Sequence, residues 1–379
     1  MKIMMVTNNY TPYSGGVVSS IDATAHALRK NGHHVIIVTL DFVGEQNTEP
    51  DVVRLACPIK FTYKKNPMAL PWRAETVLYN LVVQHKPDII HSHHPFLLGV
   101  AAIKVARKVS IPIVFTHHTM YEKYVHYVPL PVPITEPVVK TLVQAYCNQV
   151  DGIIVPSLAL RNNLREQQIN TLINVIPSSI LPIFMHPEFV YKPLVNHRPI
   201  ELLTVSRFTP EKNIKLLLDA YSLLDTQQYN FTLIGFGAQL EELQHYAYHE
   251  LNLSPTSVQF IIKPAKEIIA QWYKNADIFI FASQTETQGL VLAEAMAAGT
   301  PVIALTGTGV DDMVIDGQNG YLVDSAQQMA QKIAFLRNNN KLSQEFQQQA
   351  WQTAQKCNSY DLAHRVYEFY YSICQNTGK

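Results

Sequence analysis

Short, uninterrupted apolar runs alternate along this chain with stretches of helical period. Runs of this kind, bounded by glycine, proline or polar residues, are typical of strands buried on both faces of a parallel sheet. In the first half the predicted strands are Lys2–Thr7, Val35–Leu40, Asp88–His91, Ile111–Thr116, Gly152–Val155 and Ile173–Ile176. The predicted helices between them are Val17–Lys30, Trp72–Gln84, Leu97–Lys108 and Glu136–Gln149. The alternation predicts an α/β fold.

A proline-rich segment separates this set from a second one. Residues Pro177–Pro199 contain five prolines and no clear period, which is typical of a linker. Beyond it the predicted strands are Glu201–Val205, Phe231–Ile234, Val258–Ile262, Asp277–Phe281 and Val302–Ala304. The predicted helices lie near Ile214–Leu224, Ala238–Leu251, Lys266–Lys274 and Leu290–Ala298. The tail, Ala326–Cys374, keeps a helical apolar spacing without a strand pattern, so we expect two doubly wound domains followed by helices.

Length and composition narrow the class of protein. At 379 residues the chain is long enough for two domains. Its 30 basic and 30 acidic residues leave no net charge, which argues against a general nucleic-acid binder. No apolar run is long enough to span a membrane, the N-terminal run is too short for a signal peptide, and the four cysteines lack paired spacing. We therefore expect a cytoplasmic protein with reduced thiols.

The stretch Glu286–Glu294 carries the most informative chemistry. It reads Glu-Thr-Gln-Gly-Leu-Val-Leu-Ala-Glu and runs from the loop after a predicted strand into a predicted helix. The amides of Gly289, Leu290 and Val291 point out of the helix start, where they and the helix dipole attract a diphosphate. The two carboxylates can accept hydrogen bonds from sugar or ribose hydroxyls. The pattern suits a nucleotide-sugar; the alternative is an ordinary strand-to-helix unit with two solvated glutamates.

Other loops leave predicted strands at the same kind of position. Gly15 and Gly16 follow the first strand and can bring backbone amides close to a ligand, although a tight turn explains them equally well. Arg207 and Lys212 follow the first strand of the second half, where two cations can neutralise a leaving diphosphate. A solvated charged turn is the alternative for them. The loop Gly307–Gly309 can approach the same ligand.

Two histidine clusters follow predicted strands of the first half. One begins at His91 and reads His-Ser-His-His, and the other is His117-His118. Clustered imidazoles can form a metal site, which is the alternative. The chain has no Asp-x-Asp motif to hold a divalent cation against a diphosphate, so we expect no metal. We expect His93, His94 and His118 to line a cleft as hydrogen-bond donors, and His91 and His117 to belong to the core.

Three segments of the first half are suited to an anionic membrane surface. They are the aromatic, proline-broken Tyr121–Pro133, the helix Leu97–Val109 with Lys104, Arg107 and Lys108, and the basic aromatic loop Lys60–Lys65. The alternative is that these charges are simply solvated.

These motifs together resemble the retaining glycosyltransferases of family 4, which have the GT-B fold. The matching features are Arg207 and Lys212, Glu286 and Glu294, Ala298-Gly-Thr-Pro301, Asp316-Gly-x-Asn-Gly320, Gly15-Gly16 and His118-Thr119. Within the family, Glu286–Gly289 and His118–Tyr127 look like the bacterial diacylglycerol glucosyltransferases. The chain departs from the family at Gly235–Ala238, where Gly-Asp-Gly-Pro is frequent, and at Pro177–Leu181, where Pro-x-Gly-[Ile/Val]-Asp is frequent.

The resemblance implies two Rossmann-like, doubly wound domains that face a cleft, with a C-terminal helix that crosses back to the first domain. Residues 1–178 would form the acceptor-binding domain and 179–199 the linker. Residues 200–357 would form the nucleotide-sugar-binding domain, and 358–379 the returning helix.

The resemblance also implies roles for single residues. Glu294 would hold the ribose hydroxyls, Glu286 a donor-sugar hydroxyl, and His118 would contact the sugar. Arg207 and Lys212 would stabilise the departing diphosphate. The further donor-binding candidates are Gly15, Gly16, Gly235, Gly289, Leu290 and Val291, and the acceptor-side candidates are His93, His94, Tyr121, Tyr124 and His126. No metal or other cofactor is expected, and a phosphate oxygen would help to deprotonate the acceptor in a front-face mechanism.

The expected reaction transfers a hexose, in the first instance glucose from UDP-glucose, to diacylglycerol or another membrane lipid. The enzyme would be cytoplasmic and peripheral on the inner face of the cell membrane. A surface-polysaccharide sugar or a small metabolite as acceptor, and a nucleotide-sugar 2-epimerase, stay open. A degenerate sugar-binding scaffold is disfavoured by the intact set of charged residues. A nicotinamide dehydrogenase is disfavoured because the first strand-turn-helix lacks Gly-x-Gly-x-x-Gly.

Overall fold

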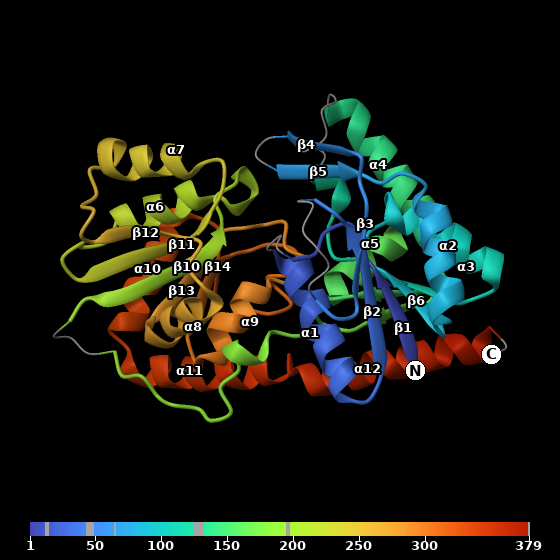
Figure 1. Ribbon diagram of the computed structural model, residues 1–379. Coiled ribbons are helices and arrows are strands. Elements are labelled where there is room, and N and C mark those ends of the chain that lie inside the picture. The colour runs from blue at the N-terminus through green and yellow to red at the C-terminus, as the bar shows by residue number, and fades with distance from the viewer. Residues whose placement is uncertain (12–14, 43–48, 64–65, 124–131, 195–197, 378–379) are drawn as a thin grey trace. The chain divides into compact units, whose positions relative to one another are not determined.

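The chain folds as two compact units. The first consists of Met1–Ser179 and Ser359–Lys379, and the second of Ile180–Asn358. Each contains a parallel sheet with helices packed on it (Figure 1). The structure, a computed structural model, describes residues 1–11, 15–42, 49–63, 66–123, 132–194 and 198–377.

The sheet of the first unit has the strand order β3-β2-β1-β6-β7-β8-β9 within the described residues, and every pair is parallel. Its strands are β1 Lys2–Val6, β2 His34–Leu40, β3 Val52–Leu55, β6 Ile89–Ser92, β7 Ile113–Thr116, β8 Gly152–Val155 and β9 Ile173–Val175. Its helices are α1 Gly16–Lys30, α2 Ala74–His85, α3 Leu98–Val109, α4 Val132–Cys147, α5 Leu158–Glu166 and α12 Ser359–Asn376. A separate antiparallel hairpin joins β4 (Ile59–Tyr63) to β5 (Asn66–Leu70).

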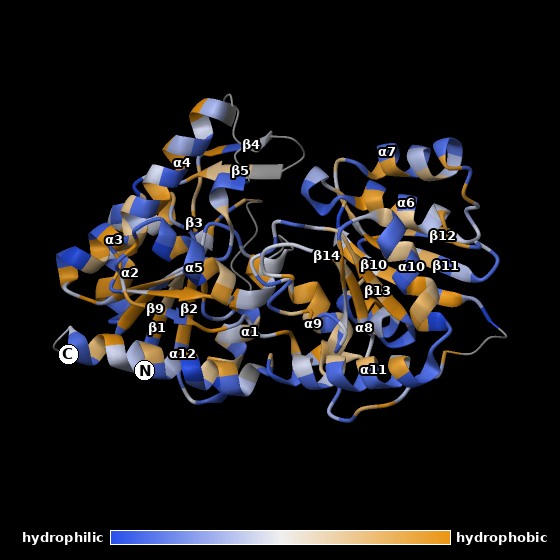
Figure 2. Ribbon diagram, turned by 180° about the vertical axis from the view of Figure 1, so that it is seen from behind, coloured by the Kyte–Doolittle hydropathy of each residue, from blue (hydrophilic) through white to orange (hydrophobic). Residues whose placement is uncertain are grey.

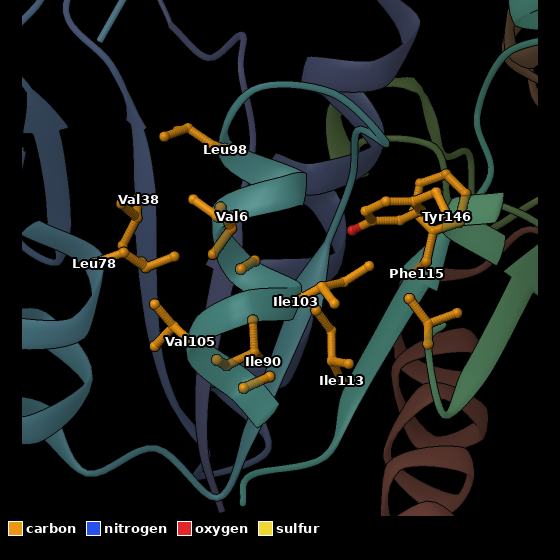
Figure 3. Close-up of a cluster of buried hydrophobic side chains, with 14 of the residues drawn as sticks. Val6, Val38, Leu78, Ile90, Leu98, Ile103, Val105, Ile113, Phe115 and Tyr146 are labelled. Atoms are coloured by element: carbon orange, nitrogen blue, oxygen red, sulfur yellow. The ribbon is translucent and has the colours of Figure 1, made fainter. Parts of the chain in front are cut away.

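Successive residues of the buried strands serve opposite faces of the first sheet. On one face Val6 and Ile90 belong to a cluster with Ile103 of α3 (Figure 3). On the other face Met5 meets α1 and α12, and α12 contributes Phe369 among other side chains. The C-terminal helix therefore belongs to the first unit, as predicted.

The predicted strands and helices of the first half are confirmed, with ends shifted by a few residues. The strand β3, the hairpin β4–β5 and the helix α5 were missed. The loop predicted at Lys60–Lys65 is wrong where it overlaps β4, because Ile59 and Phe61 alternate with polar residues as a strand requires. Lys64 and Lys65 lie outside the described residues.

The sheet of the second unit has the order β12-β11-β10-β13-β14-β15 within the described residues, again all parallel. Its strands are β10 Ile200–Arg207, β11 Tyr229–Phe236, β12 Val258–Ile262, β13 Ile278–Phe281, β14 Val302–Leu305 and β15 Gly320–Val323. Its helices are α6 Ile214–Ser222, α7 Leu240–His245, α8 Lys266–Asn275, α9 Leu290–Ala297, α10 Ala326–Arg337 and α11 Asn340–Gln355. These confirm the predicted elements, except that the helix expected at Ala238–Leu251 is α7 followed by a π-helical turn, Tyr246–Glu250. Among the described residues no helix has both the length and the apolar character of a membrane span.

The strand order reverses at one place in each sheet. β1 lies between β2 and β6, and β10 lies between β11 and β13. At such a point the connections leaving the two neighbouring strands run to opposite faces, and a crevice opens at their carboxyl ends. The loops after β1 and β6, and after β10 and β13, are therefore the expected ligand-binding positions of the two units. Figure 2 shows that these central strands are predominantly apolar.

An ion pair with a buried carboxylate joins the amino ends of β10 and β13. The Asp277 side chain is 1% exposed and accepts hydrogen bonds from two guanidinium nitrogens of Arg198, at 2.7 and 2.8 Å. It also accepts one from the backbone amide of Glu201 at 2.8 Å. Asp277 therefore fixes the two strands on which the crevice of the second unit depends.

Replacing Asp277 by alanine should destabilise the second unit by roughly 3 kcal/mol, because the amide of Glu201 and the Arg198 charge lose their partner. Denaturant unfolding followed by tryptophan fluorescence in a Trp72→Phe background measures this, since Trp272 and Trp351 both belong to the second unit. Glu345→Ala, an exposed change on α11, is the control and should stay within about 0.5 kcal/mol. An equally small change for Asp277→Ala would contradict the proposed role of the pair.

Candidate functional site

The loops after β10 and β13 bring together oppositely charged side chains that are 74 residues apart in sequence. Lys212, in the 3-10 turn Pro210–Lys212, forms an ion pair between its Nζ and Glu286 Oε1. Both are largely withdrawn from solvent, at 12% and 18% exposure. At the end of β10, Arg207 Nη2 lies 3.2 Å from Glu211 Oε1. The carboxyl edge of this sheet thus holds two cations, each beside a carboxylate.

Glu286 is held in its ionised form. Burial by itself would raise its pKa, but the charge of Lys212 and the hydrogen bond from its ammonium group outweigh burial. The charge of Arg207 acts in the same direction, and the pKa of Glu286 lies below its ordinary value. At neutral pH the loop therefore carries a carboxylate whose position is fixed by a cation.

Two glycines pack against the loop that carries Glu286. A β-carbon at Gly309 would stand 2.5 Å from the carbonyl oxygen of Glu286, and one at Gly307 would stand 2.7 Å from Cα of Gln284. Gly309 also has a φ of 75°, which side chains rarely adopt. The sequence predicted a close approach of this loop to a ligand; the structure shows its close approach to the Glu286 loop. Larger residues here would displace Glu286.

The helix α9 begins as predicted and carries the second glutamate. Gly289 precedes it with a φ of 73°, in the left-handed region that favours glycine, and Leu290 and Val291 form its first turn. Glu294 lies one turn further on and accepts a 2.8 Å hydrogen bond from the hydroxyl of Tyr273. Burial raises the pKa of Glu294 to about 7, although Tyr273 and the charge of Lys266 oppose the rise. Near neutral pH this carboxyl is therefore poised between its two protonation states.

Gly235 lies within β11 and not in a loop. It pairs with Ser206 of β10, and a β-carbon there would stand 1.8 Å from the Ser206 carbonyl oxygen. At Gly237 a β-carbon would stand 2.2 Å from the carbonyl oxygen of Phe208. These glycines let the ends of β10 and β11 close on each other directly beside Arg207.

In the first unit the loops after β1, β6 and β7 bring polar groups together. His93 Nδ1 lies 2.9 Å from His118 Nε2, and His94 Nδ1 lies 3.2 Å from both the hydroxyl of Thr7 and the amide of Asn8. Gly16 opens α1, and a β-carbon on it would meet nothing within 4 Å. These residues lie together at the carboxyl edge of the first sheet, where its strand order reverses.

Three of the histidines are fully buried. His91 and His117 are buried as expected for core residues, and His91 bonds the hydroxyls of Thr116 and Tyr370. His93 was expected to line a cleft, and that expectation is wrong: its side chain is enclosed and bonds His118. Burial lowers the pKa of all of them, so they are neutral. Among the described residues no group of three or more histidine, cysteine, aspartate or glutamate side chains has the arrangement of a metal site.

The acceptor-side candidates are only partly described. Tyr121 is half-buried, with its ring edge-on to Phe96 and to His117 at 5.4 Å between centroids. Tyr124 and His126 lie outside the described residues. The sequence did not predict Glu211 as the partner of Arg207, nor Tyr273 as the partner of Glu294. The four-residue spacing of Arg207 and Glu211 could have indicated the first of these pairs.

A cavity of the second unit lies away from these residues. It has a volume of about 840 Å³ and is lined by residues that include Phe189, Trp272 and Trp351. None of the predicted site residues lines it. The candidate site therefore lies at the carboxyl ends of the strands and not in this cavity.

Comparisons with known proteins agree with this arrangement. The profile described as "Glycosyltransferase Family 4" matches residues 14–180, and "Glycosyl transferases group 1" matches residues 187–353. Alpha-monoglucosyldiacylglycerol synthase from Streptococcus pneumoniae is 34% identical over 334 residues, which cover 85% of this chain and 75% of that protein.

Two solved structures share the fold. A sucrose-phosphate synthase from Thermosynechococcus elongatus has a TM-score of 0.81 at 21% identity and covers 98% of each chain. Anabaena HepE, solved in complex with UDP-glucose, has a TM-score of 0.76 at 19% identity and covers 98% of this chain and 100% of its own. The fold is therefore GT-B, and the chain is a glycosyltransferase that belongs to glycosyltransferase family 4.

Proposed function

We propose that the protein transfers glucose from UDP-glucose to a hydroxyl of a membrane lipid, with retention of configuration and without a metal. The observation that carries the proposal is the pair of cations, Arg207 and Lys212, at the carboxyl edge of β10 and β13 beside Glu286. The similar pneumococcal protein is named for synthesis of a glucosyl-diacylglycerol, and HepE was solved with UDP-glucose. Both support glucose as the sugar, and the first supports a lipid acceptor.

The donor is bound through its diphosphate. The amides at the start of α9, from Gly289 to Val291, and the two cations attract the phosphate oxygens. As the sugar leaves, UDP gains one further negative charge, and Arg207 and Lys212 stabilise that charge as a divalent cation does in other enzymes. Glu294 accepts hydrogen bonds from the ribose, and Glu286 accepts one from the glucose.

The chemistry needs no nucleophilic carboxylate. The acceptor oxygen forms a bond to the anomeric carbon, and the bond from that carbon to the phosphate oxygen breaks with its electron pair. The acceptor proton passes to a phosphate oxygen of the departing UDP. Attack and departure on the same face of the sugar give retention. By the resemblance to family 4, His118 is proposed to donate a hydrogen bond to the sugar.

Product analysis tests this function. The protein is incubated with a panel of UDP- and GDP-sugars and with vesicles containing diacylglycerol, an oligosaccharide or no acceptor, each with and without a chelator. Mass spectrometry and NMR should find an α-glucosyl lipid from UDP-glucose, formed equally well in the chelator. A glycosylated oligosaccharide, an epimerised donor without acceptor, or activity restored only by a divalent cation would each contradict one part of the proposal.

Lys212→Ala and Arg207→Ala should each lower turnover by about a hundredfold, because each removes a donor that stabilises developing charge. Steady-state kinetics with saturating donor measures this. Lys215→Ala is the matched control, since Lys215 lies one turn away in an exposed pair with Glu242 and should keep turnover within about twofold. Near-normal turnover of both site variants would remove these residues from the mechanism.

The pKa of Glu294 predicts a pH dependence of donor binding. Ribose hydroxyls favour the carboxylate, so the pKa of Glu294 falls on binding and a proton is released. Affinity for UDP-glucose should be full above pH 7 and should fall as the pH drops below it, by up to roughly tenfold at about pH 6. Calorimetry should show this slope in the wild type and its loss in Glu294→Gln. A slope shared by both proteins would refute the ribose assignment.

Of the three segments that the sequence suggested for a membrane surface, the helix α3 is the least suited. On α3, Lys104 pairs with Glu75 at 3.5 Å, Arg107 pairs with Asp151 at 2.8 Å, and Lys108 lies over a tyrosine ring. These charges have partners within the first unit. Basic residues of α3 are therefore not the best candidates for lipid contact.

Exposed apolar side chains are the better candidates. On the hairpin, Ile59 pairs with Leu70 and Phe61 with Met68, and all four are exposed, as is Trp72. On α4 a stripe at four-residue spacing is exposed and consists of Ile134, Val138 and Leu142. The hairpin and α4 lie near each other in both views (Figures 1 and 2). Residues 52–74 contain five basic and no acidic residues, which complements an anionic lipid surface.

Replacing Phe61 and Trp72 together by serine should lower binding to anionic vesicles by tenfold or more, because each aromatic ring contributes about 1.5 kcal/mol or more when buried in lipid. Vesicle flotation measures the bound fraction. Phe335→Ser, a comparably exposed position on α10 of the second unit, is the control and should bind like the wild type. Equal flotation of all three proteins would show that this surface does not contact lipid.

A further inference from the structure

A pair of histidines connects two loops of the first unit. His93 follows β6 and His118 follows β7, and the contact between His93 Nδ1 and His118 Nε2 is 2.9 Å long. Their ring planes are 26° apart, with centroids separated by 5.2 Å. The resemblance to family 4 assigns a role in sugar binding to His118, whereas it leaves the function of a fully buried imidazole at position 93 open.

The protonation of this pair follows from its surroundings. Burial lowers the pKa of both rings well below the ordinary value, and neighbouring histidines lower it further. Each ring therefore carries a single proton at neutral pH. A contact between two neutral imidazoles needs one nitrogen to donate and the other to accept, so the tautomers of His93 and His118 are coupled.

The second nitrogen of His93 decides which ring donates. His93 is 2% exposed, and among the described residues its Nε2 has no hydrogen-bond partner. If Nδ1 accepted, the proton of His93 would stand on Nε2 as a buried N–H without an acceptor. Such groups are rarer in proteins than unpaired acceptors, and they cost free energy. Donation from Nδ1 leaves only a lone pair unpaired and is favoured.

We propose that His93 is a positioning residue whose Nδ1–H donates to His118 Nε2 and holds His118 in the tautomer that carries its own proton on Nδ1. The second ring nitrogen of His118 is then a donor, which suits a contact with a sugar oxygen. The opposite tautomer would have an acceptor there. The importance of this pair for transfer rests on the proposed function, in which His118 contacts the donor sugar.

The packing behind His93 keeps its ring in place. The ring of His91 lies 4.0 Å away between centroids. His91 is itself fixed by Thr116 at 2.6 Å and by the hydroxyl of Tyr370 at 2.5 Å. Because Tyr370 is fully buried on α12, the C-terminal helix supports the histidine pair from the interior of the first unit.

Nitrogen-15 NMR of the full-length protein labelled on histidine reads the tautomer of each ring, and the spectrum of His118→Gln assigns His118. In the wild type Nδ1 of His118 should be protonated and Nε2 should not. His93→Leu should shift His118 toward the opposite tautomer. His93→Asn, whose amide reaches the position of Nδ1, should keep the wild-type state, whereas His93→Gln, whose amide reaches further, should behave like His93→Leu.

Turnover gives an independent reading. His93→Leu and His93→Gln should lower kcat by about tenfold to a hundredfold, and His93→Asn should recover most of it. Amide spectra check that each variant is folded. If His93→Leu does not fold, the comparison of His93→Asn with His93→Gln tests the role of His93 instead. A proton on Nε2 of His118 in the wild type, or an unchanged tautomer in both His93→Leu and His93→Gln, overturns the proposal. Normal turnover of His118→Gln would instead remove His118 from the reaction while the NMR result upholds the pairing.

Discussion

Parallel pairing of β10 with β13, and of β1 with β6, is the constraint on which the site depends. A parallel sheet brings the carboxyl ends of all its strands to one edge, so residues far apart in sequence meet there without specific loop geometry. The reversal of strand order leaves the loops at these two positions uncovered by crossover helices. Close contacts of glycine backbones then fix the loops, as at Gly235 against β10 and Gly309 against the Glu286 loop.

The two units use different electrostatics at these edges. The second unit keeps charges in pairs, Arg207 with Glu211 and Lys212 with Glu286, and a charge held beside its counter-charge keeps its position before a ligand arrives. The first unit holds imidazoles made neutral by burial, which act through the direction of their hydrogen bonds.

The sequence predicted most strands, most helices and the charged loop residues Arg207, Lys212 and Glu286, because buried parallel strands are uninterrupted apolar runs and charged residues stand out in the loops that follow them. The hairpin β4–β5 was missed since its alternating apolar residues were interpreted as a basic loop. The burial of His93 was missed because its partner lies 25 residues away and the contact depends on the register of β6 with β7. The partners of Gly235 and Gly309 are backbone atoms, which no residue pattern identifies.

In the proposed function, the diphosphate of an activated sugar binds at the carboxyl edge of β10 and β13 through protein cations and backbone amides. A crystal structure of the complex with UDP-glucose tests it most directly. Phosphate oxygens should lie within hydrogen-bond distance of Arg207, Lys212 and the amides that begin α9, with the ribose beside Glu294. A diphosphate bound away from these groups, or bound through a metal ion between it and the protein, would contradict this mode of binding.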